Sequence, residues 1–266
     1  MNRPILLRVA PRGLRNALYY RLYRKHRQNW KELYENAPLD FAPNIQMKLR
    51  PTDEGHAEIA FTGFYELDLT RMISKRAQTG GLMIDAGANY GYFSLLWAAA
   101  SNDNRVIAFE ASPKNHDALE KNVSINNLGS RIDIRKMGLG KETGMLPFSL
   151  GGEEQTGWGG LATTADEATV EVPVVTLDSC VGSDEAIEVL KIDVEGADTW
   201  VLFGAEKLLQ AKRIKHVYFE CNRGRMNLLG IGPNDAPDFL RKVGYEVECL
   251  NDPRSELVEY HATPRS

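Results

Sequence analysis

The stretch Leu82–Tyr92, which reads LMIDAGANYGY, constrains the fold of this chain more than any other. Its short apolar run ends in an acid, glycines follow at 87 and 91, and residues 93–100 are again largely apolar. This order predicts a buried strand, a tight loop and a helix. Glycine lets a ligand approach the backbone, and the start of a helix offers N–H groups that have no partner within the helix. The stretch therefore predicts a ligand-binding strand–loop–helix unit.

The remainder of the chain after residue 64 repeats the order of strand and helix. Strands are expected at residues 105–110, 132–137, 170–175, 189–193 and 214–220, and helices at residues 67–76, 113–126, 176–181, 197–211 and 237–243. A glycine-rich stretch at 143–175 interrupts this order, and two strands, 245–250 and 257–260, close the chain. The alternation predicts an α/β protein with a doubly wound, mostly parallel sheet. The closing strand pair predicts an antiparallel edge.

Residues 1–64 are expected to form an extension in front of an α/β domain at 65–266. Residues 14–30 can form a helix, because leucines recur at positions 14, 18 and 22. Residues 45–49 and 57–61 read as the two strands of a β-hairpin. The 266-residue chain is long enough for one large domain with such an appendage.

The extension differs sharply from the body in charge. Residues 1–31 hold nine Lys or Arg and no acid, which leaves 23 of the 32 basic residues against all 36 acidic ones. The helix could dock its leucine face on the body or on a second subunit, or lie on an anionic membrane as a peripheral contact. We expect no nucleic-acid partner, because no motif for one is present. The leading interpretation is docking, and a homo-oligomer is compatible with it.

The cysteines and the hydropathy of the sequence indicate in which cellular compartment the protein is located. The three cysteines, Cys180, Cys221 and Cys249, are far apart and form no CxxC pair, so neither a disulfide framework nor a zinc site is expected. No apolar run approaches the ~18 residues that a membrane span needs. Arg8 and Pro11 interrupt the apolar residues near the N-terminus, which argues against a secretory signal. We therefore predict a cytoplasmic protein.

Four predicted strands end in an acid or lead directly into one: Asp85, Glu110, Asp193 and Glu220. Ligands of doubly wound sheets bind at the carboxyl ends of the strands, near the point where the strand order reverses. These carboxylates are therefore expected to share a site. The alternative is that they cap helices, since acids are favoured at helix starts.

The glycine loop matches neither of two nucleotide fingerprints. A GxxxxGK[ST] loop fails because Tyr92 stands where the second glycine would be, and GxGxxG fails because positions 89 and 92 are Asn and Tyr. What remains is D-x-G-x-N-x-G. The acid of this motif would repel a pyrophosphate but not a cationic cofactor, and Glu110 can bind a ribose diol. S-adenosylmethionine, a nucleoside with a cationic tail and no phosphate, has these properties.

Several motifs in order resemble a known family. Residues 84–92 and 106–110 resemble the first two motifs of class I S-adenosylmethionine-dependent methyltransferases, and 190–197, reading LKIDVEGA, resembles the FkbM family among them. Shorter matches are Asn122 with Asn126, Thr176–Leu177–Asp178, Phe203–Gly204–Ala205 and Phe219–Glu220. The resemblance covers about residues 60–222, which include the pattern G-x-Y-E at 63–66.

The resemblance implies a Rossmann-like sheet and methyl transfer, usually to a hydroxyl oxygen of a sugar in a glycan or glycolipid, or of a natural product. It implies these cofactor-binding residues: Tyr65, Glu66, Asp85, Gly87, Ala88, Asn89, Gly91, Glu110, Met137, Gly138 and Asp193. By analogy, Met137 and Gly138 should lie near the adenine, and Asp193 near the methionine end. Tyr65 and Glu66 are expected to close over the cofactor.

A hydroxyl acceptor must lose a proton as it attacks, so a general base is expected. None of the five histidines falls at the carboxyl end of a predicted strand. The candidates are therefore the carboxylates Asp193, then Glu195 and Glu220. The alternative is that Asp193 or Glu195 caps the helix near Gly196. A divalent cation held by Asp193, Glu195 and Asp198 is disfavoured, and we predict no metal.

Two other functions stay open at this point. A nicotinamide-dependent oxidoreductase would share the fold and the ribose-binding acid, although the failed GxGxxG disfavours it. A non-catalytic S-adenosylmethionine-binding protein would differ only in having a blocked acceptor pocket. Trp158, in the glycine-rich stretch, could stack on an acceptor sugar or simply anchor its loop.

Overall fold

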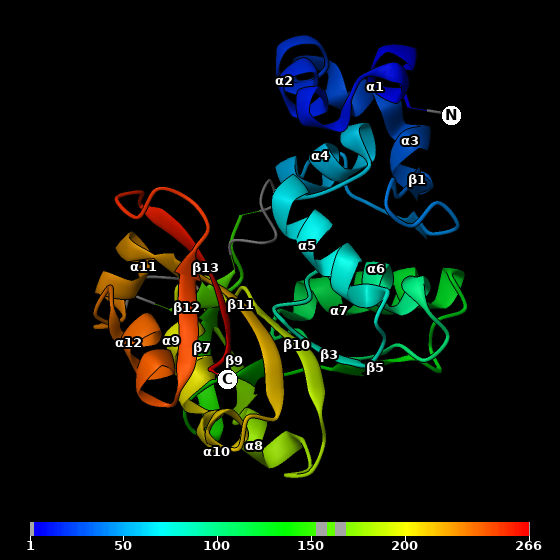
Figure 1. Cartoon of the computed structure of the whole chain (residues 1–266). Coiled ribbons are helices and arrows are strands. Elements are labelled where there is room, and N and C mark those ends of the chain that lie inside the picture. The colour runs from blue at the N-terminus through cyan, green and yellow to red at the C-terminus, as the bar shows by residue number, and fades with distance from the viewer. Residues whose placement is uncertain (1–2, 153–158, 163–168, 266) are drawn as a thin grey trace.

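The computed structural model describes residues 3–152, 159–162 and 169–265. Its centre is a seven-stranded sheet in the order β12-β13-β11-β10-β3-β4-β5 (Figure 1). The strands are β3 (Leu82–Ala86), β4 (Arg105–Phe109), β5 (Ile132–Arg135), β10 (Ile187–Ile192), β11 (Ile214–Asn222), β12 (Tyr245–Cys249) and β13 (Leu257–Pro264). β5, β4, β3, β10 and β11 are parallel, and β13 and β12 continue the sheet in antiparallel fashion. The predicted mostly parallel sheet with an antiparallel edge is confirmed.

Helices cover both faces of the sheet, as a doubly wound fold requires. One face carries α5 (Leu67–Ala77), α6 (Tyr92–Ala100) and α7 (Pro113–Ile125), and the other carries α8 (Leu177–Cys180), α9 (Asp198–Phe203), α10 (Glu206–Gln210) and α12 (Asp235–Lys242). Every residue of β3 is buried, and neighbours alternate between the two cores: Met83 joins the α6 side and Ile84 the α9 side. This two-sided burial explains why the strand reads as a continuous apolar run.

A second sheet replaces the crossover between β5 and β10. It contains β6 (Gly138–Leu139), β7 (Gly144–Ser149), β8 (Gly160–Leu161) and β9 (Thr169–Val175), in the order β6-β9-β7-β8. Downstream, the single helix expected at 197–211 is two helices, α9 and α10, separated at Gly204. A side chain at Gly204 would come within 2.0 Å of the Gly140 carbonyl oxygen, so the second sheet packs directly on this break.

The extension is mostly helical, and the hairpin expected at 45–61 is wrong in its second strand. It contains α1 (Ile5–Val9), α2 (Arg12–Leu22), a 3-10 helix η1 (Arg24–Trp30), α3 (Lys31–Glu35), β1 (Ala37–Pro38), β2 (Gln46–Met47) and α4 (Glu54–Thr62). Residues 57–61 are helical because Asp53 accepts a hydrogen bond from the His56 N–H at 3.0 Å and caps the helix start. Gly63, at φ +91°, ends it. β2 pairs with β1 instead.

The extension docks on the body where the backbone of residues 46–48 hydrogen-bonds to Asn122 and Asn126 of α7, and of the three α2 leucines Leu18 packs against the shared core. On α2 the buried residues are Tyr19 and Arg15, whereas Leu14 is 57% exposed and Leu22 is 47% exposed. The Tyr19 ring packs 5.2 Å from the ring of Phe61, and Arg15 pairs with Asp40 at 3.0 Å. Among the described residues, no helix is both long and apolar enough to cross a lipid bilayer.

One hydrophobic core joins the extension to the sheet. Leu7, Tyr19 and Phe61 belong to the same buried cluster as Trp97 of α6. Figure 1 shows α4 and α5 leading from the N-terminal helices down to the sheet. The division at residue 64 stays a prediction, but the shared core makes it a boundary in sequence across which side chains pack continuously.

Phe61→Ala should therefore destabilise the whole chain rather than the extension alone. Phe61 is fully buried, and losing such a ring costs about 3–5 kcal/mol of unfolding free energy. We expect a lower Tm in a single calorimetric transition. The exposed Leu14→Ala is the control and should change Tm little. A separate low-temperature transition, with the main one unmoved, would show that the extension unfolds independently.

Candidate active site

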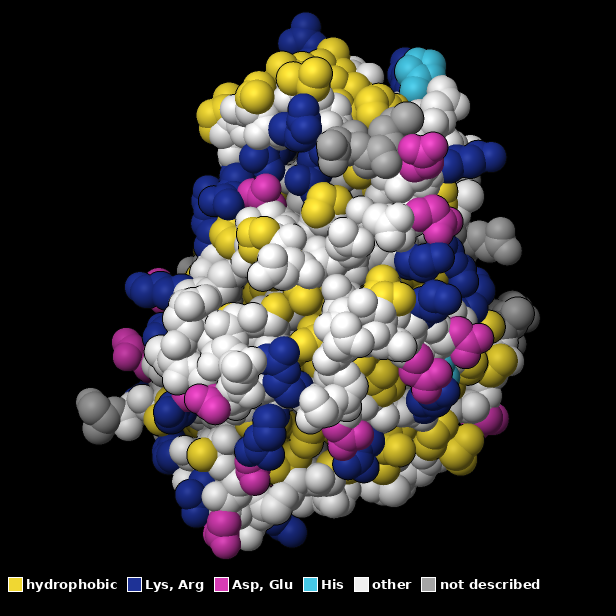
Figure 2. Space-filling view, turned by 90° about the vertical axis from the view of Figure 1, so that its right-hand side faces the viewer, with side chains coloured by type: hydrophobic (Ala, Val, Ile, Leu, Met, Phe, Trp, Pro, Cys, Tyr) yellow, Lys and Arg dark blue, Asp and Glu magenta, His cyan; other side chains and the backbone are white. Residues whose placement is uncertain are grey.

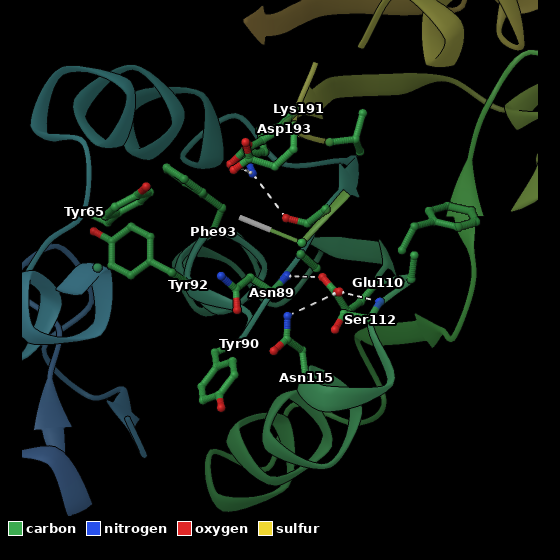
Figure 3. A pocket seen from close by; sticks show the side chains of 18 of the residues that line it. Tyr65, Asn89, Tyr90, Tyr92, Phe93, Glu110, Ser112, Asn115, Lys191 and Asp193 are labelled. Atoms are coloured by element: carbon green, nitrogen blue, oxygen red, sulfur yellow. Dashed lines mark hydrogen bonds and ion pairs between the residues drawn. The ribbon is translucent and has the colours of Figure 1, made fainter. Parts of the chain in front are cut away.

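The strand order reverses between β3 and β10, and a cavity of about 650 Å³ lies at the carboxyl ends of these strands. From β3 the chain continues to β4 and β5 on one side, while β10 and β11 lie on the other. In the sheet register, Asp85 of β3 stands beside Lys191 of β10. The cavity therefore occupies the place where doubly wound sheets bind ligands (Figure 3).

The loop after β3 needs its first glycine for a close backbone approach. Gly87 has φ +78°, and a side chain there would come within 1.9 Å of the Asp193 carbonyl oxygen in the loop after β10. The backbone of Asn89 is also in the left-handed region, at φ +51°, and its N–H donates a hydrogen bond to Glu110. The two loops that flank the reversal are thus packed backbone to backbone, and the cavity floor is narrow and preformed.

Glu110, directly after β4, is held by three donors. Its Oε2 accepts from the Asn89 N–H at 2.7 Å, and its Oε1 accepts from the Ser112 N–H at 2.8 Å and from Asn115 Nδ2 at 3.3 Å (Figure 3). Burial raises the pKa of Glu110 to about 7, although these hydrogen bonds act against the rise. The carboxyl lines the cavity and has acceptor capacity left for a ribose diol.

A buried lysine that the sequence analysis missed ties the two central strands together. Lys191 is 3% exposed, and its Nζ lies 3.1 Å from Asp193 Oδ2, 3.4 Å from the Gly87 carbonyl oxygen and 3.7 Å from Asp85 Oδ1. Burial alone would lower the pKa of Lys191, but Asp193, Asp85 and Glu66 together raise it. A lysine inside the apolar run 189–192 was the signal, because a buried lysine requires acidic partners.

Asp85 acts from beneath the loop rather than at the cavity surface. It is 1% exposed, its Oδ2 accepts from Ser94 Oγ at 2.5 Å, and its Oδ1 faces Lys191. The side chain therefore fixes the start of α6 and the position of Lys191. Asp85 therefore holds the structure beneath the glycine loop and does not face the cavity.

Three further carboxyl groups, those of Glu66, Glu195 and Glu220, line the same cavity as Glu110 and Asp193. Burial and the nearby Asp193 raise the pKa of Glu195 to about 8 and hold the pKa values of Glu66 and Glu220 well above their usual range. Glu66 and Glu195 both have left-handed backbones, at φ 42° and 55°. Asp198, which is buried and was not among the predicted catalytic or cofactor-binding residues, holds this region by accepting from the Glu220 N–H at 3.2 Å.

The structure brings most predicted site residues to one cavity. Those that line it are Tyr65, Glu66, Gly87, Ala88, Asn89, Glu110, Gly138, Asp193, Glu195 and Glu220. Asp85, Gly91 and Met137 do not line it: Gly91 begins α6 at φ +89°, and Met137 packs with the core on the α9 side. Trp158 lies outside the described residues. Within the described part of the chain, no group of three or more His, Cys, Asp or Glu is arranged to hold a metal ion.

The extension contributes a wall of this cavity that the sequence analysis did not foresee. Tyr20 of α2 and His56, Glu58 and Ile59 of α4 line it. Glu58 accepts a hydrogen bond from Asn16 Nδ2 at 2.8 Å, so α2 holds α4 in place at the cavity. No motif pointed to these residues, because their role depends on the tertiary docking of the extension.

The lining chemistry fits S-adenosylmethionine. Glu110 offers acceptors to the ribose hydroxyls, and Phe109, Leu139 and Val174 offer apolar contact for a base. The carboxyls of Asp193 and Glu66 lie in the same cavity, where a cationic tail would pair with them. The volume is within the range of sites for ligands of this size.

Residues 85–247 match the family described as the methyltransferase FkbM domain, and the chain belongs to this family. It is 28% identical over 190 residues to the hexuronic acid methyltransferase AglP of Haloferax volcanii, covering 70% of this chain and 73% of that protein. It is 30% identical over 156 residues to methyltransferase sdnD of Sordaria araneosa, covering 47% of this chain and 60% of that protein. A crystal structure of methyltransferase FkbM from Methylobacillus flagellatus KT aligns with 15% identity and a TM-score of 0.49, covering 94% of this chain and 60% of that one.

The family assignment confirms the resemblance seen in the sequence. The chain is a methyltransferase of the FkbM family, and S-adenosylmethionine is its cofactor. When bound, this cofactor supplies a methyl group on a positively charged sulfur, so the methyl carbon is already activated toward an attacking oxygen.

Glu110→Ala should weaken cofactor binding by roughly 10- to 150-fold, because hydrogen bonds to a charged group contribute about 1.5–3 kcal/mol. Calorimetric titration with S-adenosylmethionine measures this loss. The control is Glu120→Ala on the exposed side of α7, where the carboxyl pairs only with Lys136 at 2.8 Å. Unchanged affinity in the Glu110 variant would remove the ribose assignment, and stabilisation of the wild type by NAD but not by S-adenosylmethionine would contradict the site.

Proposed function

We propose that this chain transfers a methyl group from S-adenosylmethionine to a hydroxyl oxygen of a sugar, in a glycan, a glycolipid or a natural product. The observation that carries the proposal is the shape of the cavity: it continues past the residues suited to the cofactor, to Glu195, Glu220 and the wall formed by α4. A relative named a hexuronic acid methyltransferase supports a sugar acceptor.

In this proposal, different residues of the cavity bind the nucleoside, position the cationic end of the cofactor and exclude water. Gly87, Asn89 and Glu110 hold the nucleoside, and Lys191 fixes Asp193 where the cationic end of the cofactor would lie. Tyr65, whose ring packs on Tyr92 and Phe93, shields this end from water. Alignment of the acceptor and exclusion of water are the main contributions that a methyltransferase must make.

Glu195 is the proposed general base. It lines the cavity, and its pKa of about 8 places it near the pH at which a base is most effective. As the acceptor oxygen forms its bond to carbon, the hydroxyl proton passes to this carboxylate. Asp193 is less suited because Lys191 neutralises it, and the strongly raised pKa of Glu220 keeps that carboxyl protonated.

Glu195→Gln should lower kcat by about 10²- to 10⁴-fold while cofactor affinity changes far less. In the wild type, kcat/KM for the cofactor should rise with pH through about 8, because the base must be deprotonated, and the variant should lack this limb. Transfer of a labelled methyl group to a panel of sugars measures both. Glu206→Gln on the exposed side of α10 is the control. An unchanged kcat in the variant would exclude Glu195, and no transfer by the wild type would contradict the proposed function.

The family membership disfavours a nicotinamide-dependent oxidoreductase. A non-catalytic binding protein is disfavoured because the described residues leave the space beside Glu195 open as part of the cavity. The cytoplasmic location and a homo-oligomer stay predictions.

We further propose that the extension touches an anionic membrane. Its outer side carries the exposed apolar residues Ile5 (69%), Val9 (73%) and Leu14 (57%). Arg8 and Arg21 are exposed beside them, and the first 31 residues contain no acid. Figure 2 shows apolar side chains gathered at the N-terminal end of the molecule, at the top of the view, among Lys and Arg. Such a surface suits an anionic bilayer and would bring lipid-linked sugars to the enzyme.

Val9→Glu should reduce co-sedimentation with phosphatidylglycerol vesicles by about tenfold, because it replaces an apolar contact with a charge of the wrong sign. Neutral phosphatidylcholine vesicles should bind little in either case. A point variant is used because deleting the helices would remove Tyr19 from the core. Glu248→Gln, on the exposed face of β12, is the control. Equal sedimentation of wild type and Val9→Glu would remove the membrane contact.

A further inference from the structure

The carboxyl groups of the cavity greatly outnumber its cations. Besides Glu110, it is lined by Asp53, Glu54, Glu58, Glu66, Asp193, Glu195 and Glu220. Two of these are engaged within the extension: Asp53 caps α4, and Glu54 pairs with Arg24 at 2.8 Å and Arg27 at 3.4 Å. The other five face a common space.

Only two cationic side chains, Lys191 and Arg225, line the cavity among the described residues. Lys191 is already held between Asp85 and Asp193. Arg225 Nε donates to the Glu195 carbonyl oxygen at 3.3 Å, and its Nη2 donates to the Leu161 carbonyl oxygen at 3.4 Å. No Lys or Arg occurs in the sequence between Lys141 and Lys191, so the stretches 153–158 and 163–168 add no positive charge.

His56 does not compensate the acids, and it offers a separate ligand contact. It is 3% exposed, and burial lowers its pKa to about 4, so it is neutral. Its Nδ1 accepts from the Arg50 N–H at 3.3 Å, which leaves the proton on Nε2. Nε2 has no hydrogen-bond partner among the described residues, and the side chain lines the cavity. The α4 wall therefore combines a free donor for an oxygen with the carboxyl of Glu58.

We propose that the acceptor pocket selects by charge: it takes a hydroxylated acceptor that carries an ammonium group, such as an amino sugar, and excludes acceptors that carry a carboxylate. The inference rests on the proposed function and deepens it. Burial and repulsion between neighbouring carboxyls hold the pKa values of Glu66 and Glu220 above their usual range, and an ammonium group placed among these carboxyls would favour their ionised forms.

Glu58 is the residue that sets this preference from outside the matched family region. It is half-buried at the α4 wall, burial raises its pKa, and Asn16 and Tyr20 of α2 hydrogen-bond to it. It lines the same cavity as Tyr65 and Glu66, and its charge contributes to the raised pKa values of both. The carboxylate of a uronic acid would find no unpaired cationic side chain at this wall among the described residues, because Lys191 and Arg225 are already engaged. This differs from the substrate that the name of the relative AglP states.

The test compares glucose with glucosamine and glucuronic acid, each of which differs from glucose at one position. The three sugars are offered as ligands to the full chain saturated with S-adenosylhomocysteine. Binding is measured by titration and saturation-transfer NMR at pH 7.5, without turnover. We expect glucosamine to bind at least about tenfold more tightly than glucose, because an ion pair in a partly buried site contributes at least that factor. Glucuronic acid should show no saturable binding.

Glu58→Gln preserves the shape of the side chain and should reduce the preference for glucosamine over glucose at least about threefold, with unchanged affinity for S-adenosylhomocysteine. Glu120→Gln, on the exposed face of α7, should leave the ranking unchanged. Absent saturable binding of glucosamine, equal binding of the three sugars, or tighter binding of glucuronic acid would overturn the inference. Because no methyl group is transferred in this test, its failure is distinct from failure of the proposed activity, which the labelled-methyl assay reports.

Discussion

The pairing of Lys191 with Asp85 and Asp193 is the interaction on which the rest of the site depends. It joins β3 and β10, the two strands between which the sheet order reverses, and it lies beneath the loops that form the cavity floor. Burying a lysine is costly unless acids partner it, and removing one partner of such a group leaves an uncompensated charge. The position of Asp193 is therefore determined by the sheet itself, before any ligand binds.

This arrangement explains why the other acids behave differently from Asp193. One lysine cannot neutralise every carboxyl at the same end of the cavity. Glu66, Glu195 and Glu220 keep raised pKa values, and each lies on a loop or strand end that the fold brings to the reversal point. Differences in environment, rather than in residue type, separate Asp193, which is paired with Lys191, from Glu195, whose raised pKa suits proton exchange near neutral pH. The proposed roles of Asp193 and Glu195 follow from this separation.

The sheet and the nucleoside end of the site could be predicted from the sequence because both depend on local patterns. The apolar run at 82–86, the glycine at 87 and the acid at 110 lie within one strand–loop–helix–strand unit, and their spacing determines their contacts. The α4 helix was misread as a strand because its apolar run is short, and its cap residues, Asp53 and Gly63, decide the outcome. Lys191 and Glu58 were missed because their roles arise from partners distant in sequence, which only the folded chain brings together.

The two ends of the cavity therefore have different structural origins. Residues 85–110 build the nucleoside end, and they lie within the part of the chain that matches the family. The α4 wall comes from residues before the match, and α2 holds it through Asn16 and Glu58. A change in the extension can thus alter which acceptor fits while the strands that hold the cofactor stay the same, since the two sets of residues share a core but not a loop. The docked extension is therefore part of the cavity wall, and in the proposed function its position links the N-terminal helices to the choice of acceptor.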